Sequence, residues 1–128
     1  MIKIEEIEEK LNKHSPKVVF ATFEFFSGKA LDDGNILSTA GFLSKMFGNV
    51  LLICRGYADD PVLEVVDRVM IIRYRQLNFK KKHGLFERVL EFRSLLSEII
   101  NKLTTPLKLF YFQDPWSGCK FPHLNLIF

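Results

Sequence analysis

Four runs of aliphatic, β-branched and aromatic residues constrain the fold of this chain more than any other feature. Each run is almost continuously apolar, which indicates strands covered on both faces, as in a parallel sheet. The third run alternates in part, and the stretch that precedes it, from Asp59 to Arg68, has no clear pattern. The four expected strands are Lys17–Phe23, Val50–Cys54, Val69–Tyr74 and Leu107–Phe112.

Three segments with helical periodicity lie before and between these runs. Met1–Asn12 is amphipathic and ends before Pro16, because the residue that precedes a proline avoids the helical region. Asn35–Phe47 ends at Gly48, and Leu85–Leu103 has the broadest apolar face. The positions expected to be buried in the second and third helices are Ile36, Leu37, Ala40, Leu43, Met46 and Phe47, and then Phe86, Val89, Leu90, Phe92, Leu96, Ile99, Ile100 and Leu103.

This order of strands and helices predicts an α/β fold, a Rossmann-like three-layer sandwich with a mainly parallel sheet. We expect one domain over residues 1–128, with residues 1–15 as an added N-terminal helix. The apolar run Leu124–Phe128 reads as the beginning of a further strand with nothing after it. We therefore expect a fold that is incomplete at its C-terminus and self-associates through this edge, with a natural edge strand as the alternative.

The composition, 48% hydrophobic and 26% charged residues, indicates a globular chain. No apolar stretch approaches the length of roughly 20 residues that a membrane-spanning helix needs. The glutamate-rich first dozen residues do not read as a signal peptide, so we expect a cytoplasmic protein. Cys54 and Cys119 are far apart in the sequence, so we expect both to be reduced and structural, and no zinc or other metal site is predicted.

Positive charge gathers in one part of the chain. The formal net charge is +3, yet the segment from Arg68 to Arg93 alone carries +6, with eight Lys and Arg against two Asp and Glu. Within it, Lys80, Lys81 and Lys82 form either a solvent-exposed loop or a contact with an anionic membrane surface, which would make the protein peripheral to the membrane. Nucleic-acid binding is not expected, because the charge is confined to one stretch without an interleaved recognition motif.

The carboxyl ends of the expected strands are the place for a ligand site, since open α/β sheets bind ligands there. Glu24 and Asp114 each follow a strand, and their carboxylates serve either as hydrogen-bond acceptors for sugar hydroxyls or as a base. Trp116 offers a flat ring for stacking on a sugar, or else packs against the next helix. Gly34 precedes a helix and would let backbone N–H groups approach an anion, or else Asp33 or Asn35 simply caps that helix.

Several short motifs follow one another from Lys17 onward. They are Phe23-Glu24-Phe25, Gly34-Asn35-Ile36, Leu43-Ser44-Lys45, Gly48-Asn49-Val50-Leu51-Leu52-Ile53 and Phe110-Tyr111-Phe112-Gln113-Asp114-Pro115-Trp116-Ser117-Gly118. In this order they resemble the N-terminal domain of the retaining glycosyltransferases with two Rossmann domains (the GT-B fold), of the glycogen-synthase-like and lipopolysaccharide-mannosyltransferase-like group. Two positions depart from that family: Asp33 replaces the first glycine of a pair, and Gln113 replaces a histidine.

The resemblance implies that this chain is the acceptor-side half of a sugar-nucleotide-dependent glycosyltransferase. It places Gly34 near the donor diphosphate or the transferred sugar, with Asp114 and Trp116 lining the cleft. The active-site histidine and the donor-binding carboxylates of such enzymes would follow Phe128, so we expect no turnover by this chain alone. The expected ligand is a sugar or glycolipid acceptor, without a cofactor, and a nucleotide-sugar is expected only for a full-length enzyme. The alternative is a non-enzymatic α/β module that binds a ligand or serves as a scaffold.

Overall fold

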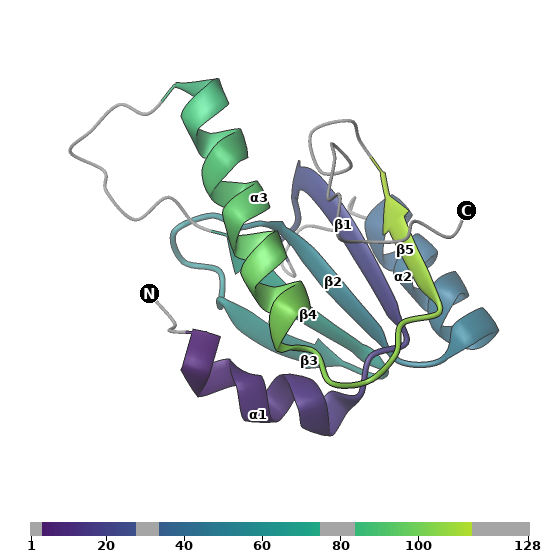
Figure 1. Cartoon of the computed structure of the whole chain (residues 1–128). Coiled ribbons are helices and arrows are strands. Elements are labelled where there is room, and N and C mark those ends of the chain that lie inside the picture. The colour runs from purple at the N-terminus through teal and green to yellow at the C-terminus, as the bar shows by residue number, and fades with distance from the viewer. Residues whose placement is uncertain (1–3, 28–33, 75–83, 114–128) are drawn as a thin grey trace.

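The computed structural model describes residues 4–27, 34–74 and 84–113 and contains helices and strands in alternation (Figure 1). The five strands form one sheet in the order β3-β4-β2-β1-β5. The elements in chain order are α1 (Ile4–His14), β1 (Val18–Phe25), α2 (Gly34–Phe47), β2 (Val50–Arg55), β3 (Leu63–Val66), β4 (Val69–Tyr74), α3 (Leu85–Lys102) and β5 (Leu109–Phe112).

The four strands expected from the sequence pair in parallel, as predicted. β1 lies between β2 and β5, with Val18 opposite both Val50 and Leu109. β2 pairs with β4 on its other side, with Val50 opposite Val69. The fold is therefore α/β, with a five-stranded, mixed and mainly parallel sheet.

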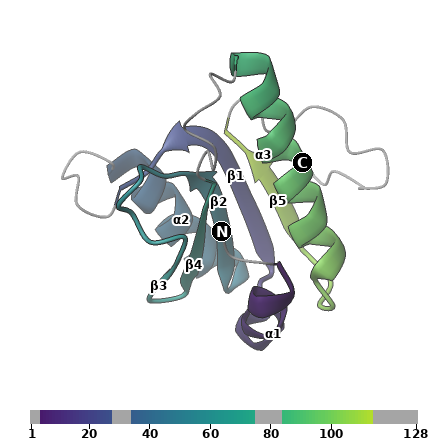
Figure 2. The ribbon, with the colours of Figure 1, turned by 90° about the vertical axis from the view of Figure 1, so that its left-hand side faces the viewer.

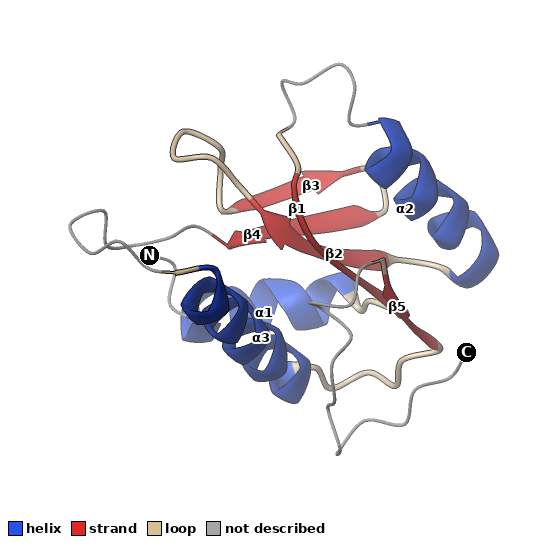
Figure 3. Cartoon of the chain, turned by 90° about the horizontal axis from the view of Figure 1, so that it is seen from above, coloured by secondary structure: helices blue, strands red, loops and turns tan. Residues whose placement is uncertain are grey.

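Helices cover both faces of the sheet, α2 on one side and α1 and α3 on the other (Figures 2 and 3). Successive strand residues point to opposite faces, so a strand buried on both sides needs an unbroken apolar run. The cluster under α2 contains Ile36, Ala40 and Leu43 with the sheet residues Val18, Phe20, Val50, Leu52, Cys54, Val69 and Ile71. The cluster under α1 and α3 contains Ile7, Leu11, Val89, Phe92, Leu96, Ile99 and Ile100 with Val19, Ala21, Phe23, Leu51, Ile53, Met70, Ile72 and Phe110.

Backbone conformation ends the first two helices where the sequence predicts an end. After α1, Ser15 adopts a positive φ of 50°, and its N–H donates to Leu11 O at 3.1 Å. After α2, Gly48 has a φ of 112°, and its N–H donates to Ser44 O at 3.0 Å. Glycine tolerates such a conformation far better than other residues, which is why it so often follows the end of a helix. Cys54 is buried, as expected for a structural cysteine.

The sequence analysis missed β3, a short strand that pairs antiparallel with β4 at the edge of the sheet. Val66 lies opposite Val69, so a two-residue turn joins the strands, and Asp67 in that turn has a positive φ of 53°. Primed hairpin turns require such a φ, and aspartate tolerates it. β3 is only partly buried, and an edge strand of this kind lacks the long apolar run that marks a central strand.

Some helix positions expected to be buried are exposed instead. Phe86 and Leu90 of α3 lie outside the apolar face, with 73% of Phe86 exposed. Leu37 and Met46 of α2 are also exposed. Helical spacing placed them near the edges of the apolar stripes, but each helix buries a narrower face against the sheet than the spacing suggested. The predicted terminal strand Leu124–Phe128 lies outside the described residues, as does Cys119.

Gly56, directly after β2, allows the chain to pass close to the side chain of Arg73. A Cβ at position 56 would lie 2.7 Å from Arg73 Cδ and 2.9 Å from Arg73 Cβ. Arg73 is almost completely buried, so its stem has little room to yield. The absence of a side chain at position 56 is therefore a packing requirement.

We expect Gly56→Ala to lower the free energy of unfolding by about 1–3 kcal/mol, the usual cost of forcing an extra carbon into a packed interior. Gly41→Ala is the matched control, because a Cβ there meets nothing within 4 Å and position 41 lies inside α2. It should raise the stability by about 1 kcal/mol through better helix propensity. Urea denaturation followed by circular dichroism measures both, and equal stability of the two variants would contradict the packing argument.

Candidate functional site at the carboxyl edge of the sheet

The order in which the chain adds strands to the sheet changes direction between β1 and β5. From β1 it proceeds through β2 to β4 on one side, and after α3 it returns to β5 on the other side of β1. In open α/β sheets such a reversal, called the switch point, leaves a crevice at the carboxyl ends of the two strands, and ligands bind there. Here those ends are Phe25 of β1 and Phe112 of β5.

Glu24 and Gln113 meet at this position. The backbone N–H of Gln113 donates to Ala21 O at 3.1 Å, which holds the residue after β5 against β1. Its side-chain Nε2 donates to Glu24 Oε2 in a long hydrogen bond of 3.5 Å. Gln113 Oε1 is buried and has no hydrogen-bond partner among the described residues. A carboxylate and an amide with remaining hydrogen-bonding capacity thus lie side by side at the switch point.

A stacked column of rings and one guanidinium stands at the carboxyl ends of β1 and β2, at the same edge of the sheet. The Arg55 guanidinium carbon lies 3.8 Å from the ring centre of Phe23 and 4.2 Å from that of Phe25. Phe25 in turn stacks on Tyr57, with ring centres 4.5 Å apart and planes inclined by 13°. The Arg55 Nε also donates to the Phe23 carbonyl. Tyr57 forms the outer end of the column and is 54% exposed.

The loop after β2 is held by Asp60, a buried carboxylate. Its Oδ1 accepts a hydrogen bond from Ser27 Oγ at 2.8 Å, and its Oδ2 accepts one from the Tyr57 N–H at 2.9 Å. Ser27 follows β1, so this carboxylate joins the segments that leave two neighbouring strands. Tyr57 is therefore oriented through its backbone by Asp60 and through its ring by Phe25.

Arg73 lies beneath these loops with its guanidinium fully buried. Its Nε donates to Phe26 O at 2.7 Å, and its Nη1 donates to Pro61 O at 3.0 Å. Its Nη2 faces Glu64 Oε1 at 2.8 Å as an ion pair, without a well-aligned hydrogen bond. These partners belong to the segments after β1 and β2 and to β3, so one buried cation connects all three.

The structure brings together only part of the predicted site. Glu24 lies at the switch point, and Gly34 is the first residue of α2, the helix that leads from the carboxyl end of β1 back to the start of β2. Asn35 lies inside α2, so it is not the N-terminal cap. Asp114, Trp116 and the lysines Lys80, Lys81 and Lys82 lie outside the described residues, as does Asp33.

The sequence analysis placed the ligand site at the carboxyl ends of the strands without singling out the side chains at the end of β2 and after it. Arg55 and Tyr57 were therefore missed, and Phe25 entered only as part of a family motif. A cationic side chain close to several aromatic residues in the sequence is compatible with cation–π stacking, but the spacing alone does not show it. Gln113 was noted only as a departure from the family pattern.

The described side chains at this edge can bind a ligand through hydrogen bonds and ring stacking. They do not form a recognisable set of catalytic residues. No cluster of three His, Cys, Asp or Glu side chains within the described ranges has the geometry to hold a metal ion. Among the helices described, none has the length and apolarity needed to cross a bilayer. Comparisons of the chain with protein-family models, with curated proteins and with solved structures found no match. Function is therefore inferred from the geometry of the carboxyl edge and from the sequence motifs.

Tyr74 is the last residue of β4, at the same edge of the sheet, and the pKa of its phenol is raised. Burial raises its pKa above the usual value of about 10, and the hydrogen bond to Glu91 and the charge of Glu91 raise it further. Arg88 and Arg55 act on this pKa in the opposite direction. The neutral phenol is thus favoured by the folded state, and its contribution to stability is complete below the pKa of tyrosine in the unfolded chain.

We expect stability to fall as the pH rises above about 10, because the unfolded chain then releases the Tyr74 proton before the folded protein does. Tyr74→Phe should flatten this alkaline decline, and Glu91→Gln should also flatten it by lowering the Tyr74 pKa. Glu98→Gln, an exposed change on the same helix, is the matched control. Urea denaturation at a series of alkaline pH values measures the slope, and identical slopes in wild type and Tyr74→Phe would refute the assignment.

Proposed function

We propose that this chain is the acceptor-binding half of a sugar-nucleotide-dependent glycosyltransferase with two Rossmann domains. A sugar, free or as a glycolipid headgroup, binds at the carboxyl edge of the sheet between β1 and β5. The observation that carries the proposal is the pair formed by Glu24 and Gln113 at the switch point, at 3.5 Å. The order of the sequence motifs from Lys17 onward supports it independently.

The chemistry of the pair suits a polyhydroxylated ligand. An ionised carboxylate accepts hydrogen bonds from hydroxyl groups, and an amide both donates and accepts them. Glu24 is exposed, so its remaining lone pairs face solvent. Charge-assisted hydrogen bonds of this type are about twice as strong as neutral ones, which makes the carboxylate the main anchor.

The ring column supplies the second element of sugar recognition. Sugars have apolar C–H faces that pack on aromatic rings, and binding sites in general combine apolar walls with a few placed polar groups. The exposed rings of Phe25 and Tyr57 provide such a surface at the same edge of the sheet, and Phe25 directly follows Glu24 in β1. In this proposal Asp114 and Trp116, which follow Gln113 in the sequence, extend the same site.

The donor would be bound mainly by a second domain. Transfer from a nucleotide-sugar requires positive charge or N–H donors on the leaving diphosphate. Two arginines of this edge are already engaged, Arg73 in its buried ion pair and Arg55 between two rings. The lysines Lys80, Lys81 and Lys82 would help to hold a glycolipid acceptor at an anionic membrane surface.

The proposal predicts weak but specific sugar binding by this chain. Titration with a panel of monosaccharides and disaccharides, followed by amide chemical shifts, should perturb Glu24, Tyr57 and Gln113. Glu24→Gln should weaken the tightest sugar about tenfold, the loss expected for a charge-assisted hydrogen bond. Glu9→Gln, an equal charge change at an exposed position of α1, is the matched control and should leave the affinity unchanged.

The same titration with uridine and guanosine diphosphate sugars tests whether this chain binds the acceptor and leaves the donor to a second domain. Each nucleotide-sugar should bind no more tightly than its sugar alone, and a transfer assay should show no turnover. Micromolar binding of a nucleotide-sugar would overturn the half-enzyme interpretation. Absence of any sugar-dependent shift at the carboxyl edge would favour the non-enzymatic α/β module instead.

A further inference from the structure

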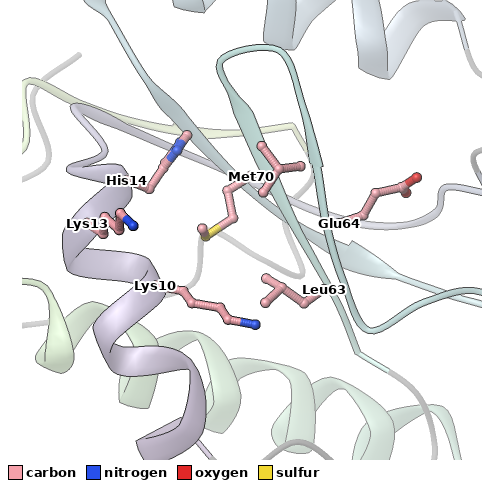
Figure 4. A pocket seen from close by; sticks show the side chains of 7 residues that line it. Lys10, Lys13, His14, Leu63, Glu64 and Met70 are labelled. Carbon is pink, nitrogen blue, oxygen red and sulfur yellow. The ribbon is translucent and has the colours of Figure 1, made fainter.

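A cavity of about 400 Å³ lies between α1 and the β3–β4 hairpin, away from the carboxyl edge (Figure 4). This volume is within the range of pockets that hold small ligands. The hairpin contributes apolar side chains, and α1 contributes basic ones. The residues that matter here are Leu63, Val65 and Met70 on the hairpin side and Lys10, Lys13 and His14 on the helix side.

The cavity exists because α1 is fastened away from the hairpin. The Asn12 side chain donates to Lys102 O at 3.2 Å and accepts from the Thr104 N–H at 3.0 Å, which ties α1 to the end of α3. His14 Nε2 lies 3.0 Å from Val50 O and fixes the last turn of α1 to β2. The apolar face at the end of the hairpin is left partly uncovered, and Val65 is 55% exposed.

The charge of the cavity is positive. Lys10 and Lys13 are exposed, and neither forms an ion pair with another described residue. Figure 4 shows the Lys10 side chain extending across the cavity towards Leu63. Glu64, the acidic residue of the lining, points away in the same view, and its carboxylate pairs with Arg73 at 2.8 Å. It therefore does not neutralise the lysines.

We propose that this cavity binds an aliphatic monocarboxylate. The alkyl chain of the ligand packs against Leu63, Val65 and Met70, and its carboxylate lies between Lys10 and Lys13. The apolar wall and the two ammonium groups match the two parts of such a ligand. A single negative charge fits better than a phosphate dianion, because the carbonyl groups of the last turn of α1 carry the negative end of the helix dipole. Two full positive charges exceed that partial charge and hold one carboxylate.

Octanoate is the probe, and octan-1-ol is its uncharged analogue of equal chain length. Calorimetry of the whole chain should show saturable octanoate binding, and octan-1-ol should bind at least severalfold more weakly. Amide chemical shifts should move at Lys10, Lys13, Leu63 and Val65, and the carboxyl edge around Glu24 should stay unperturbed. Absence of saturable octanoate binding, or shifts confined to other parts of the chain, would overturn the proposal.

Two variants separate the anionic and the apolar contacts. Lys10→Gln combined with Lys13→Gln should weaken octanoate about tenfold, as expected for two partly solvated ion pairs, and should leave octan-1-ol unchanged. Val65→Asp should abolish binding of octanoate by placing a negative charge in the apolar wall. Lys45→Gln, an exposed lysine near the end of α2 on the other face of the sheet, is the matched control.

Each of these variants is expected to fold, because the three lysines and Val65 are exposed. Denaturation midpoints near that of the wild type confirm this before binding is measured. An affinity that the double lysine variant leaves unchanged, or that Lys45→Gln lowers equally, would overturn the assignment of the carboxylate to Lys10 and Lys13. Equal binding of octanoate and octan-1-ol would overturn it as well.

Discussion

A buried guanidinium holds together the edge of the sheet at which the site lies. Removing a charged group from water is costly, and the cost is offset only where every part of the group finds a partner. Arg73 meets most of this condition: its Nε and Nη1 donate to the carbonyl groups of Phe26 and Pro61, and its charge faces the carboxylate of Glu64 and lies near the ring of Phe26. Only Nη2 makes its ion pair without a well-aligned hydrogen bond. Because these partners belong to three different segments, displacing any one of them would remove part of what compensates the burial of the cation. The conformations of the three segments are therefore coupled.

The candidate site benefits from this coupling because its groups stand on segments that cannot move independently. Phe26 is fixed by Arg73, and its neighbours Phe25 and Ser27 contact Tyr57 and Asp60 of the next loop. The ring column and the carboxylate of Glu24 therefore keep their relative positions without a ligand. Preorganisation of this kind lowers the entropy that binding has to overcome, which matters most for a weakly bound, polar ligand such as a sugar.

The sequence predicts the central sheet well because burial on both faces imposes an unbroken apolar run, and the four parallel strands satisfy that requirement. It predicts β3 poorly because an antiparallel edge strand is half exposed, and its pairing depends on a turn at Asp67 that only the positive φ reveals. The residues of the candidate site are likewise predictable only where a local sequence pattern marks them. The position of Glu24 follows from the end of a strand, whereas the contact between Ser27 and Asp60 joins residues 33 positions apart and has no local signature. Family resemblance led towards Asp114 and Trp116, and physical packing led instead to Arg55 and Tyr57.

Arg73 also sets the charge at the cavity beside α1, which is otherwise unrelated to the carboxyl edge. Glu64 stands on β3, whose neighbouring residues Leu63 and Val65 line that cavity, and an unpaired carboxylate there would be the acidic group of the cavity lining. The ion pair with Arg73 takes Glu64 out of that role, because a fully buried cation with few alternatives holds its partner more strongly than a solvated lysine does. The lysines of α1 are thereby left to attract an anion from solution. One buried ion pair thus orders the loops at the carboxyl edge and leaves the hairpin cavity positively charged.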